Sequence, residues 1–180
     1  PLPGETQGES EDAVFLDADK VVFEEETGLA VAEGNVRVRR DVLRVFAHRV
    51  EMDSTEQVMS ATSEPGKKVT LIQGDRVLTG DSLRYNMLSR EGILTGAVGS
   101  SPAGDGRVFL RGKQMEVAPV DVARSKGWIS SKGSKGVEED ELIGKLSDVS
   151  LTTCNERSPH YRLVSKSVVF VPGKRIIAKN

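Results

Sequence analysis

The stretch ADKVVFEEETGLAVAEGNVRV, residues 18–38, decides the fold of this chain. Side chains alternate along a β-strand, so Val21 and Phe23 would lie on one face and Lys20 on the other. The polar residues 24–28, EEETG, predict a turn. A return strand then begins near Leu29 and resumes at residue 36 after a break at Gly34-Asn35. The stretch therefore predicts a hairpin with one apolar face.

The opening of this hairpin recurs along the chain as small, any, polar, apolar, any, large apolar. Such units begin at Ala18, Ala47, Gly80, Gly112 and Ser165, so successive starts are 29, 33, 32 and 53 residues apart. A unit that recurs every 20 to 50 residues is typical of a stacked architecture. One hairpin cannot bury its apolar face alone, so we expect the units to stack with their apolar pairs on one shared face.

Composition supports an all-β fold. Aromatic residues make up only 4% of the 180 residues and hydrophobic residues 37%, which predicts a thin core. No stretch sustains helical spacing, and short polar-faced strands with frequent turns are typical of antiparallel sheets. We predict repeated antiparallel hairpins with little or no helix, forming one domain at 13–180 after a mobile polar arm at 1–12.

Charge and residue types argue against several functions. A net charge of −2 gives no basis for nucleic-acid binding. The six-residue spacing of Cys154 and His160 is weak evidence for a catalytic thiol and its base. Together with His48 they would supply few ligands for a metal ion. The acidic runs 24–26 and 138–141 are interpreted as solvated turns. We therefore predict no enzyme, no catalytic residue, no metal and no cofactor.

The repeat units resemble a known family. Segments 18–38, 47–61, 80–98 and 112–129 are similar to the OstA-like repeat of the lipopolysaccharide transport proteins LptA, LptC and the N-terminal domain of LptD. The AEGNV sequence at 32–36 resembles the Gly-Asn-Val return of that family. LTTC at 151–154, YRL at 161–163 and IIAKN at 176–180 resemble LptD in particular, where a Thr-x-Cys sequence follows the repeats.

This resemblance implies an open, V-shaped β-jellyroll that is not an enzyme. It implies a domain that holds lipid A acyl chains in an apolar groove and passes lipopolysaccharide across the periplasm, as part of or attached to the outer membrane. An LptA-like partner would join edge to edge, through strands near 13–16, while 175–178 forms the other edge. In a longer protein, 151–180 would lead toward a β-barrel with an LptE-like lipoprotein. Cys154 is then either a free thiol or one half of a disulfide to that missing part.

The residues themselves predict an apolar groove, formed by the aligned pairs of the units and by their return strands. An alternative for each residue is an ordinary closed core, and an alternative function is a structural or adhesive β-repeat module without a lipid ligand. The predicted groove residues are Val21, Phe23, Leu29, Val31, Val36, Val50, Met52, Val69, Leu71, Leu83, Tyr85, Ile93, Met115, Val117, Ile129, Val168 and Phe170.

Overall fold

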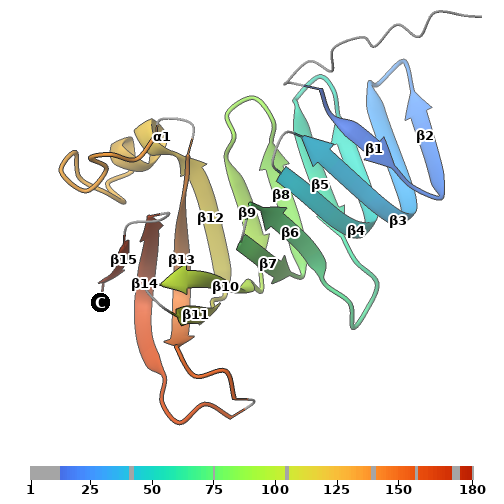
Figure 1. The fold of residues 1–180 in the computed structure, drawn as a ribbon. Coiled ribbons are helices and arrows are strands. Elements are labelled where there is room, and N and C mark those ends of the chain that lie inside the picture. The colour runs from blue at the N-terminus through green and yellow to red at the C-terminus, as the bar shows by residue number, and fades with distance from the viewer. Residues whose placement is uncertain are drawn as a thin grey trace, which may run out of the picture.

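The computed structural model describes residues 13–40, 43–74, 76–103, 106–138, 141–156, 158–171 and 175–179. The arm predicted at 1–12 lies outside these residues. Within them the chain forms fifteen β-strands and one short helix, α1 (Val120–Ser125). The prediction of an antiparallel all-β fold with little helix is confirmed (Figure 1).

The strands follow one another as hairpins of uneven length. They are β1 (Phe15–Asp17), β2 (Lys20–Glu24), β3 (Leu29–Arg40), β4 (Leu43–Asp53), β5 (Val58–Thr62), β6 (Val69–Gln73), β7 (Arg76–Gly80), β8 (Ser82–Asn86), β9 (Gly92–Thr95), β10 (Val98–Ala103), β11 (Gly106–Arg111), β12 (Gln114–Pro119), β13 (Leu142–Thr152), β14 (Leu163–Val171) and β15 (Arg175–Lys179).

Two sheets face each other, and the long strands belong to both. Sheet A runs in the order β2-β3-β4-β5-β8-β9-β12-β13-β14-β15. Sheet B runs in the order β1-β3-β4-β6-β7-β10-β11-β13-β14. Because β3, β4, β13 and β14 cross from one sheet to the other, backbone hydrogen bonds connect all the strands (Figure 1).

The small residue that opens each repeat unit lies at the corner between the sheets. Gly80 ends β7 in sheet B, and β8 begins in sheet A at Ser82. A Cβ added at Gly80 would lie 2.5 Å from the Thr95 carbonyl oxygen, so the crossing strands approach too closely for a larger residue. In β3 the predicted break at Gly34-Asn35 is a β-bulge within a continuous strand, with Asn35 in the left-handed conformation at φ 47°.

The apolar positions of the repeat units align in register across sheet A. The prediction that they share one face is confirmed, and that face is turned toward sheet B. One row contains Val21, Ala32, Val50, Ala61, Leu83, Leu94, Met115, Leu146 and Val168. The neighbouring row contains Phe23, Ala30, Met52, Met59, Tyr85, Gly92, Val117, Gly144 and Phe170.

Four residues that the sequence assigned to this inner face lie elsewhere. Leu29 and Val31 alternate with Ala30 and Ala32, so they point outward and pair with Asp53 and Glu51. Ile93 also faces outward, with its side chain 40% exposed, because its neighbour Leu94 takes the inner position. Ile129 is buried, but in a separate core.

That second core covers the outer face of sheet A at its C-terminal end. The connection between β12 and β13 folds back through α1, and Val120, Ala123, Trp128, Ile129 and Val137 pack there against Ile143, Val169 and Val171. Strands β13 and β14 are therefore apolar on both faces, with Leu146 and Val168 turned toward sheet B. Figure 1 shows α1 and its following loop beside the end of β12.

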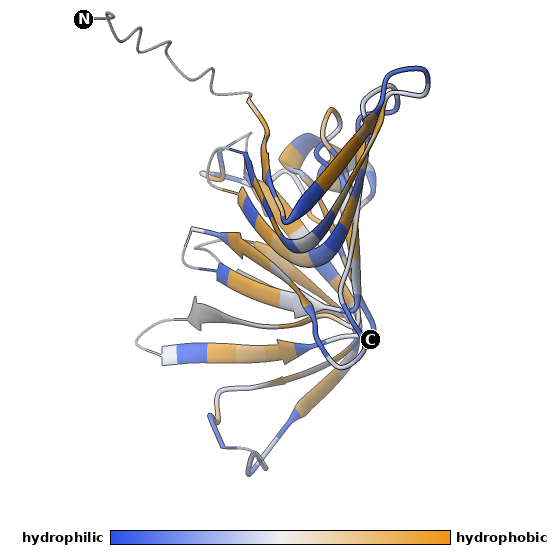
Figure 2. Ribbon diagram, turned by 90° about the vertical axis from the view of Figure 1, so that its right-hand side faces the viewer, coloured by the Kyte–Doolittle hydropathy of each residue, from blue (hydrophilic) through white to orange (hydrophobic). Residues whose placement is uncertain are grey.

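The two ends of the stack present edge strands. In the described part of the chain, β1 and β2 each pair only with β3, and β15 pairs only with β14. This register confirms that the predicted segments near 13–16 and 175–178 are sheet edges, and it adds β2 as a further edge that the sequence analysis did not name. Figure 2 shows hydrophobic and hydrophilic residues alternating along the strands between these ends.

Candidate functional site

A narrow apolar cavity lies between the two sheets. Its volume is about 40 Å³. Sheet A contributes Leu83, Tyr85, Met115, Val117, Leu142, Gly144 and Phe170, and sheet B contributes Leu43, Leu71, Gln73, Arg76 and Leu78. One water molecule occupies about 30 Å³ in the liquid, so this space has the size of one or two methylene groups. The two sheets are thus close together in the middle of the molecule.

The interior opens toward the edge formed by β2. Val21 and Phe23 belong to the inner-facing rows, yet they are 49% and 57% exposed. Two strands farther in along the same rows, Val50 is buried and Met52 is half-buried. An apolar surface therefore leads from an exposed strand edge into the closed middle of the molecule.

Most of the predicted groove residues share this interior. Val36, Val50, Met52, Val69, Leu71, Leu83, Tyr85, Met115, Val117, Val168 and Phe170 belong to one apolar cluster. Of these, Leu71, Leu83, Tyr85, Met115, Val117 and Phe170 line the cavity itself. Burial shows that they form the core, and their contact with a lipid stays a prediction.

Sequence reasoning missed several cavity residues. Leu78 lies two residues before the small residue Gly80, and Leu43 lies four residues before Ala47, so extending the repeat pattern backward would have found both. Gly144 carries no sequence signal, because only its register opposite Val117 and Phe170 places it at the cavity. Gln73 and Arg76 end and begin adjacent strands, where a polar residue ordinarily indicates a solvated turn.

Tyr85 brings a polar group to the end of the apolar interior. Its side chain is 6% exposed, and burial raises the pKa of its hydroxyl above the usual value. The nearby positive charges of Arg90 and Arg40 act in the opposite direction, and the Arg90 side chain hydrogen-bonds Tyr85. Arg76 is the arginine among the lining residues of the cavity.

A second hollow of about 300 Å³ lies on the outer face of sheet B, beside the loop that connects β13 and β14. Phe109, Arg111, Cys154 and Arg162 are among its lining residues. The Cys154 sulfur lies 3.5 Å from His160 Nδ1, on the same loop. Cys154 is half-buried and is not disulfide-bonded within the described residues. Cys154 therefore borders this hollow as a free thiol in the described chain.

Neither a metal centre nor a membrane-spanning helix is found in the described ranges. No group of three or more His, Cys, Asp or Glu residues there could hold a metal ion. The described part of the chain likewise contains no helix with the length and apolar character needed to cross a membrane.

More than half of the chain matches a known protein family. Residues 16–119 match the family model described as LptA/(LptD N-terminal domain) LPS transport protein. Among solved structures, the chain is similar to LptH, the LptA-homologous periplasmic component of the lipopolysaccharide transport device of Pseudomonas aeruginosa. The identity is 18%, the TM-score is 0.46, and the match covers 59% of this chain and 76% of LptH. No curated protein is similar enough to count as a match. The chain belongs to the LptA/LptD N-terminal family of lipopolysaccharide transport proteins.

Proposed function

We propose that this domain binds the acyl chains of lipopolysaccharide between its two sheets and passes the lipid toward the outer membrane. The observation that carries the proposal is the continuous inner surface, which is exposed at Val21 and Phe23 and reaches the cavity at Leu83 and Val117. Such a surface offers a flexible hydrocarbon chain an entrance at one edge and apolar contacts along its path.

Simple energetics support a non-covalent carrier. Each buried methylene group stabilises the bound state by about 0.8 kcal/mol, so about ten of them would contribute about 8 kcal/mol before ordering costs. Because the cavity has a volume of only about 40 Å³, a chain that enters it must push the sheets apart. Sheets A and B are joined by the crossing strands, so separation would occur by opening the space between β7 and β9 rather than by dissociation.

Site-specific photo-crosslinking tests the proposal. A photoreactive residue at Phe23 or Leu83 should form an adduct with lipopolysaccharide, because both positions face inward. The matched control is Arg84, which lies next to Leu83 on β8 but is exposed on the outer face. Crosslinking at Arg84 and none at Phe23 or Leu83 would exclude the groove. A structural or adhesive module would yield no lipid adduct at any of the three positions.

We further propose that the edge strands join neighbouring domains of the transport system. An unpaired strand edge can accept a strand from another chain. The N-terminal edge, β1 and β2, would take an LptA-like domain. Gel filtration of the purified domain with an LptA-like protein should give a complex at micromolar concentration, and separate elution of the two would argue against this partner.

We also propose a role for the C-terminal segment 151–180 and its Cys154. Residues 13–180 would act as one domain, with 151–180 leading toward an outer-membrane barrel and its LptE-like lipoprotein. Cys154 would form a disulfide with that further part, since its thiol borders an open hollow. A non-reducing gel of the full-length protein should show a faster-migrating form that Cys154→Ser abolishes. Unchanged migration in that variant would leave Cys154 a free thiol.

A further inference from the structure

We propose that strand β2 pairs with β2 of a second copy of this chain, in a symmetric antiparallel dimer centred on Val22. This inference goes beyond the proposed function, because the dimer needs no lipid and no other protein. The five residues of β2, KVVFE, are all exposed at one end of sheet A. In the described part of the chain, β2 pairs only with β3. Its other edge can therefore accept a further strand.

The composition of β2 is unusual for a strand at the edge of a sheet. Native proteins commonly protect such edges with proline, with bulges or with charged side chains. Strand β2 instead pairs regularly with β3 over its whole length, and its three central residues are Val21, Val22 and Phe23. These apolar side chains lie on both faces of the strand and are 49%, 51% and 57% exposed. A regular apolar edge of this kind is a template for another strand.

The order of residues in β2 makes the strand complementary to itself. In an antiparallel pair centred on Val22, Lys20 of each copy lies opposite Glu24 of the other. Val21 of each copy lies opposite Phe23 of the other, and both belong to the inner-facing rows. Opposite charges on neighbouring strands stabilise their pairing, and like charges weaken it. Sheet A would thus continue from one copy into the other with matched charges and matched apolar rows.

The two charged residues of β2 form no ion pair with any other residue that the structure describes. Glu33, which lies opposite Lys20 on β3, forms an ion pair with Arg49. The Glu24 carboxylate accepts a hydrogen bond of 2.7 Å from the Thr27 hydroxyl, and its two oxygens can accept several more. Lys20 and Glu24 can therefore pair across the dimer without breaking an ion pair.

The charges at the other end of sheet A make it a poorer match. Strand β15, RIIAK, is basic at both ends. Continuing the inner-facing rows from β15 of one copy into β2 of the next would place Ala178 opposite Val21. Lys179 would then lie opposite Lys20, which is a like-charge pair. Pairing β15 with itself would place Arg175 opposite Lys179. Only the pairing of β2 with β2 brings every charge of these two edges opposite its complement.

Sedimentation equilibrium of the purified chain tests the dimer. At micromolar concentrations the average mass of the wild-type chain should rise toward twice that of one copy. Lys20→Glu makes both symmetric charge pairs repulsive and should raise the dissociation constant of the dimer about tenfold or more. Glu24→Lys should have the same effect. A wild-type chain that stays monomeric, or single variants that dimerise as well as the wild type, would overturn the proposal.

Two further samples test the register itself. The double variant Lys20→Glu/Glu24→Lys exchanges the two charges, so its dissociation constant should return to within about twofold of the wild-type value. An equimolar mixture of the two single variants should form a mixed dimer, because each charge then meets its opposite. A double variant or a mixture that stays monomeric would overturn the pairing centred on Val22.

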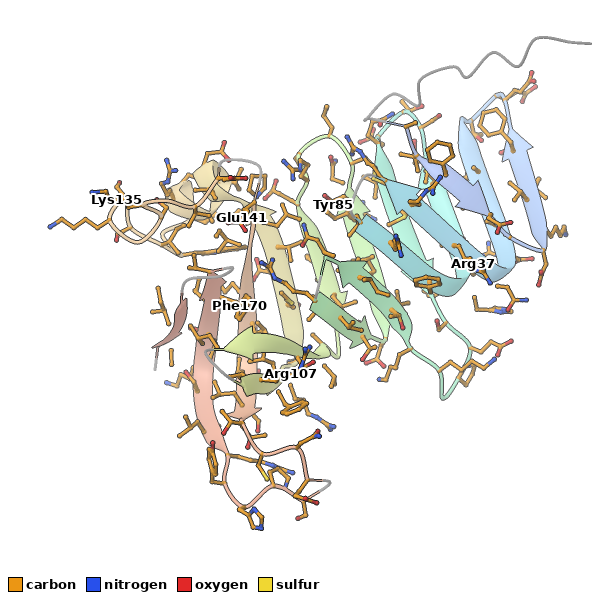
Figure 3. All side chains as sticks on the ribbon, in the orientation of Figure 1. Arg37, Tyr85, Arg107, Lys135, Glu141 and Phe170 are labelled. Atoms are coloured by element: carbon orange, nitrogen blue, oxygen red, sulfur yellow. The ribbon has the colours of Figure 1, made fainter. Side chains whose placement is uncertain are left out.

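The matched control is Lys135→Glu, which changes the net charge by the same amount as Lys20→Glu. Lys135 is exposed in the loop after α1, at the far end of the molecule from β2 (Figure 1 and Figure 3). This variant should dimerise as the wild-type chain does. An equal loss of the dimer in Lys135→Glu would overturn the proposal, because net charge rather than β2 would then govern association.

Circular dichroism verifies that each variant folds, and spin labelling carries the test if a charge variant does not. In a Cys154→Ser background, a label at Val22→Cys should show strong dipolar broadening, because Val22 lies opposite itself across the two-fold axis. A label at Val77→Cys, which is exposed on sheet B, should show none. Absence of broadening at Val22→Cys at concentrations where the chain is dimeric would overturn the proposal.

The outcomes for this dimer and for the proposed transport partner are distinguishable. Dimers of the chain without a complex with an LptA-like protein support this inference and argue against that partner. A complex with the LptA-like protein, formed by a chain that is otherwise always monomeric, does the reverse. Both associations would use β2, so the LptA-like protein should dissociate the dimer. A dimer that persists in a saturated complex would overturn the assignment of the dimer contact to β2.

Discussion

Tyr85 is the residue at which the apolar interior meets charge. Its ring continues the inner row of sheet A, between Met59 on β5 and Gly92 on β9. Its hydroxyl instead lies close to the Arg90 side chain. An aromatic ring with a polar tip suits such a position, because the ring packs in the core while the hydroxyl finds a partner.

The titration of Tyr85 is directly measurable. Burial raises the pKa of Tyr85 above 10.0 in the folded chain. The neutral phenol therefore contributes its full stability below the pKa of the unfolded state. This contribution is lost as the pH rises through the pKa of the folded state. In the variant Tyr161→Phe, Tyr85 is the remaining tyrosine. Its phenolate absorbance should have a midpoint above about 10 when folded, and a midpoint of about 10 in denaturant. A folded midpoint at or below the denatured one would contradict the burial argument.

The corner glycines set a second test at the scale of single residues. Gly80→Ala places a Cβ 2.5 Å from the Thr95 carbonyl oxygen and should lower the free energy of unfolding by about 1–3 kcal/mol. Gly112→Ala is the matched control at the same position of the next unit. A Cβ added there would lie 3.1 Å from its nearest neighbour, the Ser147 carbonyl oxygen. Urea denaturation should give a smaller loss for Gly112→Ala. A larger loss of stability for Gly112→Ala than for Gly80→Ala would mean that the close approach of strands at the corner is not the reason for glycine there.

At the scale of elements, the segment after β12 behaves as a cover for sheet A. Helix α1 is too short to be stable by itself, because isolated helices need about 12–15 residues. It is held by burial of Val120 and Ala123 and by Trp128, which is 5% exposed. The ammonium groups of Lys126 and Lys145 lie 5.3 Å and 5.6 Å from the Trp128 ring. The cover thus depends on one aromatic anchor.

Removing that anchor should be costly. We expect Trp128→Ala to lower the free energy of unfolding by about 3–5 kcal/mol, as large-to-small core substitutions do. Leu88→Ala is the control, since Leu88 is 82% exposed and a surface change should remain within about 0.5 kcal/mol. Denaturation followed by circular dichroism gives both values. A loss below about 1 kcal/mol for Trp128→Ala would show that the second core adds little to the fold.

At the scale of the whole molecule, two sheets form a stack joined by long crossing strands. Strands β3, β4, β13 and β14 tie the sheets together at the two ends, while β7 and β9 face each other near the middle with separate strands. The two ends are therefore tied by shared strands, and the lipid proposed above would have to widen the middle.

Electron spin resonance measures this opening. Val77 and Ile93 are 41% and 40% exposed on the outer faces of sheets B and A, so spin labels there report the spacing of the sheets. In a Cys154→Ser background, phosphorylated lipid A should increase the distance between labels at Val77→Cys and Ile93→Cys. A label pair at Val77→Cys and Phe109→Cys, both within sheet B, is the control and should not change. An unchanged distance between the sheets on lipid binding would mean that the lipid does not enter between them.

The sequence by itself determined the repeat unit, its antiparallel strands and the inner face of its apolar pairs, because two-residue alternation is a local property of a strand. It also placed the edges and identified the family. Only the tertiary structure decided which side chains of the first return strand face inward, because the register places Ala30 and Ala32 on the inner face and Leu29 and Val31 on the outer face. It also decided the place of Ile129, which the path of the chain after β12 brings into the second core. The cavity likewise depends on pairing between residues far apart in the chain. No local pattern encodes such distances, because they follow from how corners, bulges and strand twist add up along the whole stack.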